Sequence, residues 1–477
     1  MMKISGVKNF NSGDLPQKSY YKFYSYKMKL ICGILFTLFF IAQDVKAQKK
    51  PFLKADATKY TQTLKKLTDV MIEDVTGPCA AARYYTYANM VSYEIINQHL
   101  QPDNYFSLHT IVSDYPDLSG YKKQDPIDIN FASLYGLLRI GEELLPSGYL
   151  LETPRNDLLK EAGKQFKLNK QLIDASIAYA DTIVKHFARY AARDGYVKTS
   201  GYMRYTPFKE PGSWQPTPPG YMEAYEPHWG NLRPFLLEEV NNYKPEPPVP
   251  FSAVEGTDFF NLAKEVYDST NVLTDEQKEI AGFWDCNPFF LIQKGHITFG
   301  TKKISPGGHW MGITGIASIQ KQLSLAETVR WHTYVSITMA DAFISCWKEK
   351  YVSNRIRPET FINVAIDRDW RPILQTPPFP EYTSGHSVVS SSVAIVLTKL
   401  AGENFSYTDT VEEEFGLPAR SFNSFCEAAQ EAAISRFYGG IHFKDAIYNG
   451  VAQGEKIGNF MAEKLDLNKS KSIPYLY

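Results

Sequence analysis

The chain has 477 residues, of which 44% are hydrophobic and 22% are charged. This composition is typical of a globular protein with ample core-forming residues, and the length suits one large domain or about two to three ordinary ones. The formal net charge of -1 gives no electrostatic reason to expect nucleic acid or an anionic membrane as a partner.

An apolar segment near the N-terminus predicts export. It begins at Met28, followed by a lysine, is apolar over residues 30–42 and reaches a small residue at Ala47. A basic start, an apolar stretch too short for a bilayer span and a small residue at the cut are typical of a secretory signal peptide. We therefore expect residues 1–47 to be upstream residues and signal peptide, and the mature chain, beginning near Gln48, to be periplasmic or secreted without a stable membrane span. The alternative is an uncleaved anchor.

Export would place the remaining cysteines in an oxidising compartment. These cysteines are widely spaced, so one disulfide between two of them is possible. None of them forms a Cys-x-x-Cys metal motif. These cysteines are Cys79, Cys286, Cys346 and Cys426.

Helical periodicity dominates from residue 54 to about residue 183. Residues 193–250 are instead rich in proline, glycine and aromatic residues, which cannot continue helices and are typical of a long ordered connection. We take residues 48–250 as an N-terminal helical region that includes this connection.

The second half returns to helical patterns. Thr274 and Gln277 have the spacing of a capping box, and residues 324–351 predict a helix of about seven turns. The Gly439-Gly440 pair predicts a break between the last two helices. We therefore predict a mainly α fold of two helical bundles side by side, with residues 251–477 as the catalytic domain and the connection covering the mouth of its site.

Three short motifs in the second half combine cationic, hydroxyl and imidazole groups. Each is ordinary alone, since a single Lys or Arg near a helix end is usually solvated and a single His is usually structural. The motifs are Lys350-x6-Arg357-Pro, Ser384-Gly385-His386 and Ser435-Arg436-x5-His442.

Together the three motifs suit a tetrahedral oxyanion. One lysine and two arginines supply three positive charges and many donors. The Gly385 N–H and the Ser384 hydroxyl add directional donors at a helix start. His386 and His442 remain, one to attack or coordinate the central atom and one to move a proton.

This ordered set resembles the signature of the superfamily of type-2 phosphatidic acid phosphatases, bacterial class A acid phosphatases and vanadium-dependent haloperoxidases. The motif region runs from Lys350 to Asp445, and flanking segments such as "FWDCNP" and "SPGGHW" are similar to the soluble haloperoxidase-like branch. The resemblance implies that Lys350, Arg357, Arg436, Ser384 and Gly385 bind the oxygens of phosphate or vanadate. It implies that His386 is the acid–base, and that His442 is the vanadium ligand or the phosphate-attacking nucleophile.

Two positions depart from the family pattern. Thr383 replaces the usual proline before Ser-Gly-His, which should alter the rigidity of the turn but not the ligand set. The carboxylate that commonly follows the last histidine by four residues is here Asp445, three residues after His442. Its role in orienting the imidazole is therefore open, and a helix-terminal carboxylate is an equal alternative.

The resemblance allows two chemistries. A haloperoxidase would hold vanadate and use hydrogen peroxide and halide, whereas a soluble acid phosphatase would need no cofactor and would hydrolyse a phosphate ester through a phosphohistidine at His442. Trp347 and Phe379 match aromatic positions around the halide in chloride-oxidising members, which favours the haloperoxidase, although both are equally well explained as core residues.

A non-catalytic phosphate- or vanadate-binding protein is a third reading, disfavoured because anion binding alone does not need two imidazoles. Two other histidines, His228 and His309, are more typical of structural residues and would at most line the entrance.

Overall fold

The computed structural model describes residues 56–99, 107–118, 126–294, 296–300 and 302–467. The predicted signal peptide lies outside these ranges. Within them, helices predominate and the strands form two short antiparallel hairpins, so the prediction of a mainly α fold is confirmed. The hairpins pair β1 (Leu291–Lys294) with β2 (Ile297–Gly300) and β3 (Tyr407–Asp409) with β4 (Arg420–Phe422).

In its described residues the N-terminal half contributes five long helices, as its periodicity predicts. Three of them begin at a side chain that accepts a hydrogen bond from the first turn, namely Asp56, Asp128 and Asn169. The helices are α2 (Ala57–Glu73), α3 (Pro78–Asn97), α4 (Ile129–Leu144), α5 (Glu152–Lys164) and α6 (Lys170–Ala191). Short 3-10 turns lie at η2 (Leu108–Thr110) and η3 (Gly148–Leu151).

The connection over residues 193–250 is ordered by buried anchors. It contains only short helical turns, at α7 (Tyr196–Thr199), η4 (Trp229–Asn231) and η5 (Val240–Tyr243). The buried carboxylate of Asp341, from the second half, accepts the backbone N–H groups of residues 235, 236 and 237 at 2.7, 2.7 and 2.9 Å. These bonds fasten the connection to the core, because a buried carboxylate and three buried N–H groups satisfy one another.

The C-terminal half contains the remaining helices. The predicted capping box of Thr274 and Gln277 is present, and a second one, of Ser324 and Glu327, starts the longest helix. The helices are α8 (Asp258–Thr270), α9 (Asp275–Phe283), α10 (Pro306–Gln320), α11 (Leu325–Ser353), α12 (Pro358–Ala365), α13 (Gly385–Ala401), α14 (Phe425–Tyr438) and α15 (Lys444–Lys464). A 3-10 turn, η6 (Val411–Phe415), lies between β3 and β4.

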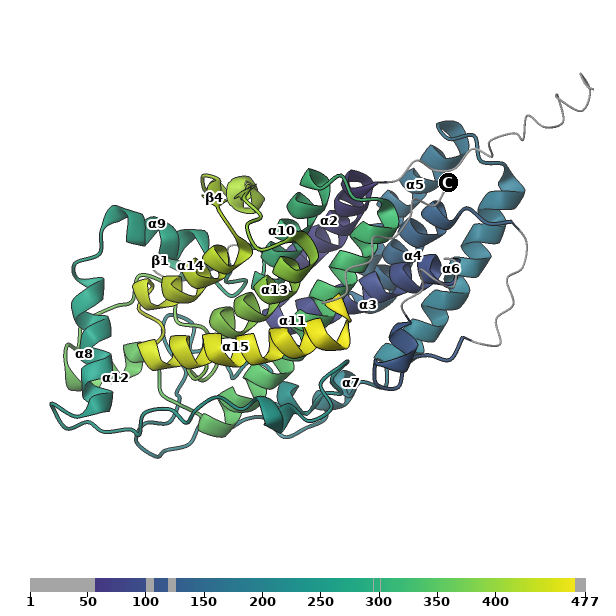
Figure 1. The fold of residues 1–477 in the computed structure, drawn as a ribbon. Coiled ribbons are helices and arrows are strands. Elements are labelled where there is room, and N and C mark those ends of the chain that lie inside the picture. The colour runs from purple at the N-terminus through teal and green to yellow at the C-terminus, as the bar shows by residue number, and fades with distance from the viewer. Residues whose placement is uncertain (1–55, 100–106, 119–125, 295, 301, 468–477) are drawn as a thin grey trace, which may run out of the picture. The chain divides into compact units, whose positions relative to one another are not determined.

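Helix α11 is central to both halves. It packs against α3 on one side and against α13 on the other, as Figure 1 shows. Most of its residues are buried all round the helix, which is why a single apolar stripe is only part of its pattern. A helix surrounded in this way is a rigid support for the residues near its C-terminal end, Trp347 and Lys350.

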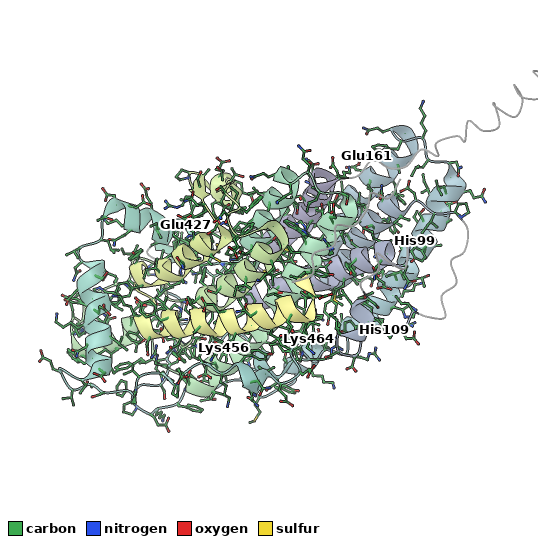
Figure 2. The ribbon with its side chains drawn as sticks, in the orientation of Figure 1. His99, His109, Glu161, Glu427, Lys456 and Lys464 are labelled. Atoms are coloured by element: carbon green, nitrogen blue, oxygen red, sulfur yellow. The ribbon has the colours of Figure 1, made fainter. Side chains whose placement is uncertain are left out.

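Helices α13 and α15 pack closely through a stripe of glycines on α15. A Cβ at Gly454 would clash with the carbonyl oxygen of Val388, and one at Gly458 would lie 2.8 Å from that of Ser392. Charged residues of α15, such as Lys456 and Lys464, lie outside this glycine contact (Figure 2). The glycines therefore let the backbone of α15 approach the start of α13, where His386 lies.

Among the described residues, no helix combines the length and the apolar character needed to cross a bilayer.

The glycine stripe gives a testable prediction. Gly454→Ala should lower the free energy of unfolding by about 1–3 kcal/mol, because the added methyl group overpacks the α13–α15 contact. Gly282→Ala is the matched control: its added Cβ would meet no atom within 4 Å, so stability should be unchanged or rise by up to about 1 kcal/mol. Urea unfolding of both variants measures the difference, and equal stabilities would contradict the packing argument.

Candidate active site

The residues of the three motifs come together around one point. Lys350 lies in the last turn of α11, Arg357 caps α12, and Arg436 lies in the last turn of α14. Ser384 caps α13, whose first residues are Gly385 and His386, and His442 lies in the turn between α14 and α15. The exposed fractions of Lys350, Arg357 and Ser384 are 0%, and those of Arg436 and His442 are 2% and 3%.

Local backbone features explain these placements. Asn354 adopts a left-handed conformation that ends α11, and Pro358 at the first position of α12 restarts a helix just after Arg357. Gly440 has a φ of 76°, as the Gly439-Gly440 motif predicts, and turns the chain so that His442 faces back toward α13.

A cavity of about 50 Å³ lies at the point of convergence. Six of the residues selected from the sequence line it: Trp347, Phe379, Gly385, His386, Arg436 and His442. Lys350, Arg357 and Ser384 do not line it but support residues that do. Ser384 accepts the N–H of Ser387 at 3.3 Å and so acts as a helix cap as well.

Arg357 contacts His442 directly. Its Nη1 donates to Nε2 of His442 at 3.2 Å and to the carbonyl of Ile441 at 2.9 Å, while its Nε donates to the carbonyl of Phe379 at 2.9 Å. Because Nε2 accepts this hydrogen bond, the imidazole proton is assigned to Nδ1. The lone pair on the Nε2 atom of His442 therefore points toward the guanidinium group.

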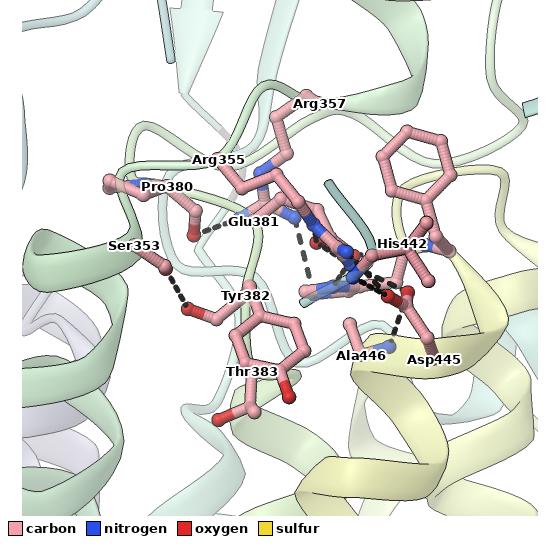
Figure 3. Close-up of polar contacts among 12 residues, drawn as sticks. Ser353, Arg355, Arg357, Pro380, Glu381, Tyr382, Thr383, His442, Asp445 and Ala446 are labelled. Carbon is pink, nitrogen blue, oxygen red and sulfur yellow. Dashed lines mark hydrogen bonds and ion pairs between the residues drawn. The ribbon is translucent and has the colours of Figure 1, made fainter. Parts of the chain in front are cut away.

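Glu381 orients His442, a role that sequence reasoning missed. Its carboxylate accepts Nδ1–H of His442 at 2.8 Å and the backbone N–H of Phe443 at 2.9 Å. Arg355 holds the same carboxylate at 2.7 Å, and Figure 3 shows this group of contacts. An isolated acid in the otherwise uncharged segment "TPPFPEYTSGH" was the available signal, since a carboxylate in such a setting needs a buried partner.

Among the described residues, Asp445 bonds to Arg355 and not to His442. It binds Arg355 through two hydrogen bonds of 2.6 and 2.7 Å, and accepts the backbone N–H of Val249 at 3.2 Å. Asp445 therefore acts one step behind the imidazole: it fixes Arg355, which fixes Glu381, which orients His442.

Lys350 organises the loop that precedes Ser384. Its Nζ donates to the carbonyls of Pro380 and Glu381 at 3.2 and 3.1 Å, and also to that of Thr383. Burial lowers the pKa of Lys350 to about 8. In the described part of the chain neither Lys350 nor Arg357 has a carboxylate within ion-pair distance.

The two imidazoles are held neutral. Burial, reinforced by Arg436 and His442, keeps the pKa of His386 well below its usual value, and burial with Arg357 and Lys350 does the same for His442. The Nε2 atom of His386 is buried and makes no hydrogen bond with any described residue, although the ring lines the cavity. A neutral ring with a free nitrogen at a cavity wall is suited to accept or donate a proton.

Arg436 is the third cation of the site. It donates to the carbonyl of Ala281 at 3.1 Å and lies 4.0 Å from the carboxylate of Asp285, which also pairs with Lys303 at 2.6 Å. Asp285 is thus shared between two cations. The site as a whole carries more positive than negative charge, which favours a bound anion.

Two comparisons identify the family. A family model described as the VCPO second helical-bundle domain matches residues 330–468. A solved structure described as the first bacterial vanadium-dependent iodoperoxidase is 41% identical, with a TM-score of 0.79, over 86% of this chain and 97% of that chain. The chain belongs to the vanadium-dependent haloperoxidase family. The resemblance inferred from the motifs is therefore confirmed, and the chain is an enzyme of the peroxidase type.

Holo and apo structures of a bacterial vanadium-dependent chloroperoxidase share the same fold. Each is 14% identical with a TM-score of 0.61, over 82% of this chain and over 93% and 94% of their own chains. No curated protein matches the chain.

Aromatic side chains form one wall of the haloperoxidase cavity. The rings of Trp347 and Phe379 lie 4.9 Å apart, and Tyr225 from the connection packs behind them at 6.3 and 6.4 Å. The backbone carbonyl of Tyr225 accepts hydrogen bonds from Trp347 and Tyr351 at 3.3 and 2.6 Å. The connection therefore supports the aromatic wall.

The remaining histidines lie elsewhere. His309 is completely buried and His228 lies in a separate surface pocket. Neither is among the residues that line the cavity, which agrees with the structural role expected of both.

The position of Glu381 yields a prediction. Glu381→Gln should weaken binding of orthovanadate about 10- to 100-fold, because the neutral amide orients His442 less firmly and reduces its basicity. Glu359→Gln is the control, since Glu359 is a buried carboxylate bonded to Thr376 and is not among the residues that line the cavity. Titration calorimetry with orthovanadate compares them; similar affinities in the two variants would contradict the positioning role.

Proposed function

We propose that this haloperoxidase oxidises iodide with hydrogen peroxide at a vanadate bound to His442. The observation that carries the proposal is the 41% identity to a bacterial vanadium-dependent iodoperoxidase over nearly all of that chain. The convergence of Lys350, Arg357, Arg436 and the two histidines supports it, because these are the groups that a bound tetraoxo anion and its chemistry require.

The residues fit vanadate by the chemistry of their donors. His442 presents a nitrogen lone pair, Arg436 and the helix start at Gly385 line the cavity, and the Nε2 atom of His386 is buried without a partner. Lys350 and Arg357 have donors that now go to neutral acceptors, so an anion would offset the cost of burying their charge. Vanadate, when bound, supplies the activation of peroxide for oxygen transfer to a halide.

The chain's own groups then have separate tasks. The net reaction, in which iodide, hydrogen peroxide and a proton give hypoiodous acid and water, requires a proton to be moved. His386, neutral and free at Nε2, is placed to take a proton from peroxide and return it to the departing water. Glu381 keeps the proton of His442 on Nδ1, so that Nε2 carries the lone pair, and the cationic groups stabilise negative charge in the cavity.

The aromatic wall suits iodide. Trp347, Phe379 and Phe343 present apolar surface to the cavity. A halide ion that enters against such a wall loses part of its hydration shell. The free-energy cost of this loss is smallest for iodide, because it is the largest of the common halides and the most weakly hydrated. The substrates of this proposal are therefore small molecules, hydrogen peroxide and a halide.

Activity assays test the proposal directly. The chain from Gln48, loaded with orthovanadate, should oxidise iodide only when both vanadate and peroxide are present. His386→Ala should reduce this rate about 100- to 10,000-fold. His442→Ala should remove the vanadate-dependent oxidation of iodide altogether. His228→Ala, which alters a histidine in a separate surface pocket, should leave the rate unchanged.

Two outcomes would overturn the assignment. Hydrolysis of p-nitrophenyl phosphate that vanadate blocks, without halide oxidation, would select the phosphatase. Neither activity, combined with tight orthovanadate binding, would select the anion-binding protein.

We also propose that the enzyme is exported. The pattern from Met28 to Ala47 supports this, since it has the charge, length and small residues of a cleaved signal. N-terminal sequencing of the protein from a periplasmic or culture fraction should begin near Gln48. Recovery of the chain in the membrane fraction with residues 28–47 still attached would show an uncleaved anchor instead.

A further inference from the structure

A second group of metal-ligating side chains lies beside the active site. It consists of Cys286 in the loop after α9, His309 in the first turn of α10 and Glu412 in η6. Their exposed fractions are 3%, 0% and 5%. None of these residues has a part in the reaction derived above.

The ligand atoms have the spacing of a tetrahedral metal site. The Nδ1 atom of His309 lies 3.3 Å from Sγ of Cys286 and 3.1 Å from Oε1 of Glu412, and Sγ lies 3.6 Å from the same Oε1. Zinc bonds of about 2.3 Å to sulfur and about 2.0–2.1 Å to nitrogen and oxygen give tetrahedral edges of about 3.3–3.6 Å. Matched pair by pair, the three measured edges are within about 0.3 Å of these values.

The other nitrogen of His309 has the partner that a metal-bound histidine requires. Its Nε2 lies 2.7 Å from Oδ2 of the fully buried Asp409. Metal-ligating histidines almost always donate their second N–H to a carboxylate or carbonyl, which fixes the tautomer. The ring is held further by Trp284, stacked on it at 4.7 Å.

We propose that Cys286, His309 and Glu412 bind a zinc ion. The thiolate and imidazole favour Zn²⁺ over Mg²⁺ or Ca²⁺, and zinc has no redox chemistry of its own to compete with peroxide. Each nitrogen of His309 faces a carboxylate, Nε2 that of Asp409 at 2.7 Å and Nδ1 that of Glu412 at 3.1 Å. A thiolate and an imidazole lone pair are the forms that bind zinc, so metal binding would displace protons from these ligands.

The ion would support the active site from behind. It would join three segments that are distant in sequence, namely the loop at Cys286, α10 and η6. Cys286 follows Asp285, whose carboxylate lies 4.0 Å from Arg436, and itself lines the active-site cavity. Zinc could therefore reach the three ligands from the cavity. A water molecule could enter in the same way and serve as the fourth ligand.

Cobalt binding tests this inference independently of halide oxidation. The chain from Gln48, freed of metals with a chelator and without vanadate, should bind one Co²⁺ with a thiolate-to-cobalt absorption band in the near ultraviolet, and Zn²⁺ should displace it. Cys286→Ser should remove the band, whereas Cys426→Ser, which alters the exposed thiol, should keep it.

Asp409→Asn serves as a milder variant that keeps all three ligands, and it should weaken Zn²⁺ binding about 10- to 100-fold. Absence of the thiolate band in the unaltered chain, or a band lost in Cys426→Ser but kept in Cys286→Ser, would overturn the zinc site whatever the halide assays show.

Discussion

The burial of positive charge without matching carboxylates is the constraint on which the rest of the structure depends. Lys350 and Arg357 are fully buried, and in the described part of the chain their donors reach backbone carbonyls and one imidazole nitrogen. Carbonyls satisfy the N–H groups but leave the charges uncompensated. A protein that keeps such groups inside its core is built to bind an anion there, and the helix ends around the cavity are arranged to bring those groups to one place.

A second layer of contacts keeps the imidazole of His442 available. Asp445 binds Arg355, Arg355 binds Glu381, and Glu381 accepts the Nδ1 proton of His442. Burial and the surrounding cations hold its pKa well below the usual value, so the ring stays neutral over the range in which most enzymes work. The same cations that attract the anion thus preserve the lone pair that binds it.

Much of this arrangement could be predicted from the sequence. Strong caps and long periodic segments identified the helices, because those signals are local. The three motifs identified the charged residues of the site and the family to which the chain belongs. They could do so because the order and spacing of the motifs reflect positions at helix ends that the fold requires.

What the sequence did not reveal depends on contacts between distant segments. Glu381 and His309 acquire their roles only through contacts between distant segments. The isolated acid at Glu381 is a local signal that it has a buried partner, but nothing local shows that this partner is His442. The spacing of Asp445 left its role open for the same reason. The four cysteines in the described part of the chain, for which one disulfide was open, are unpaired; Cys79, Cys286 and Cys346 are buried and Cys426 is exposed. The division at residues 250 and 251 stays a prediction, since α11 packs against helices of both halves.

The most direct test of the central claim is a crystal structure of the chain soaked with orthovanadate. The account predicts vanadium bonded to Nε2 of His442, with Arg357 turned from that nitrogen to an anion oxygen and with Lys350, Arg436 and the Gly385 N–H around the remaining oxygens. Vanadate bound elsewhere, or His442 still bonded to Arg357 beside an anion that it does not touch, would contradict it.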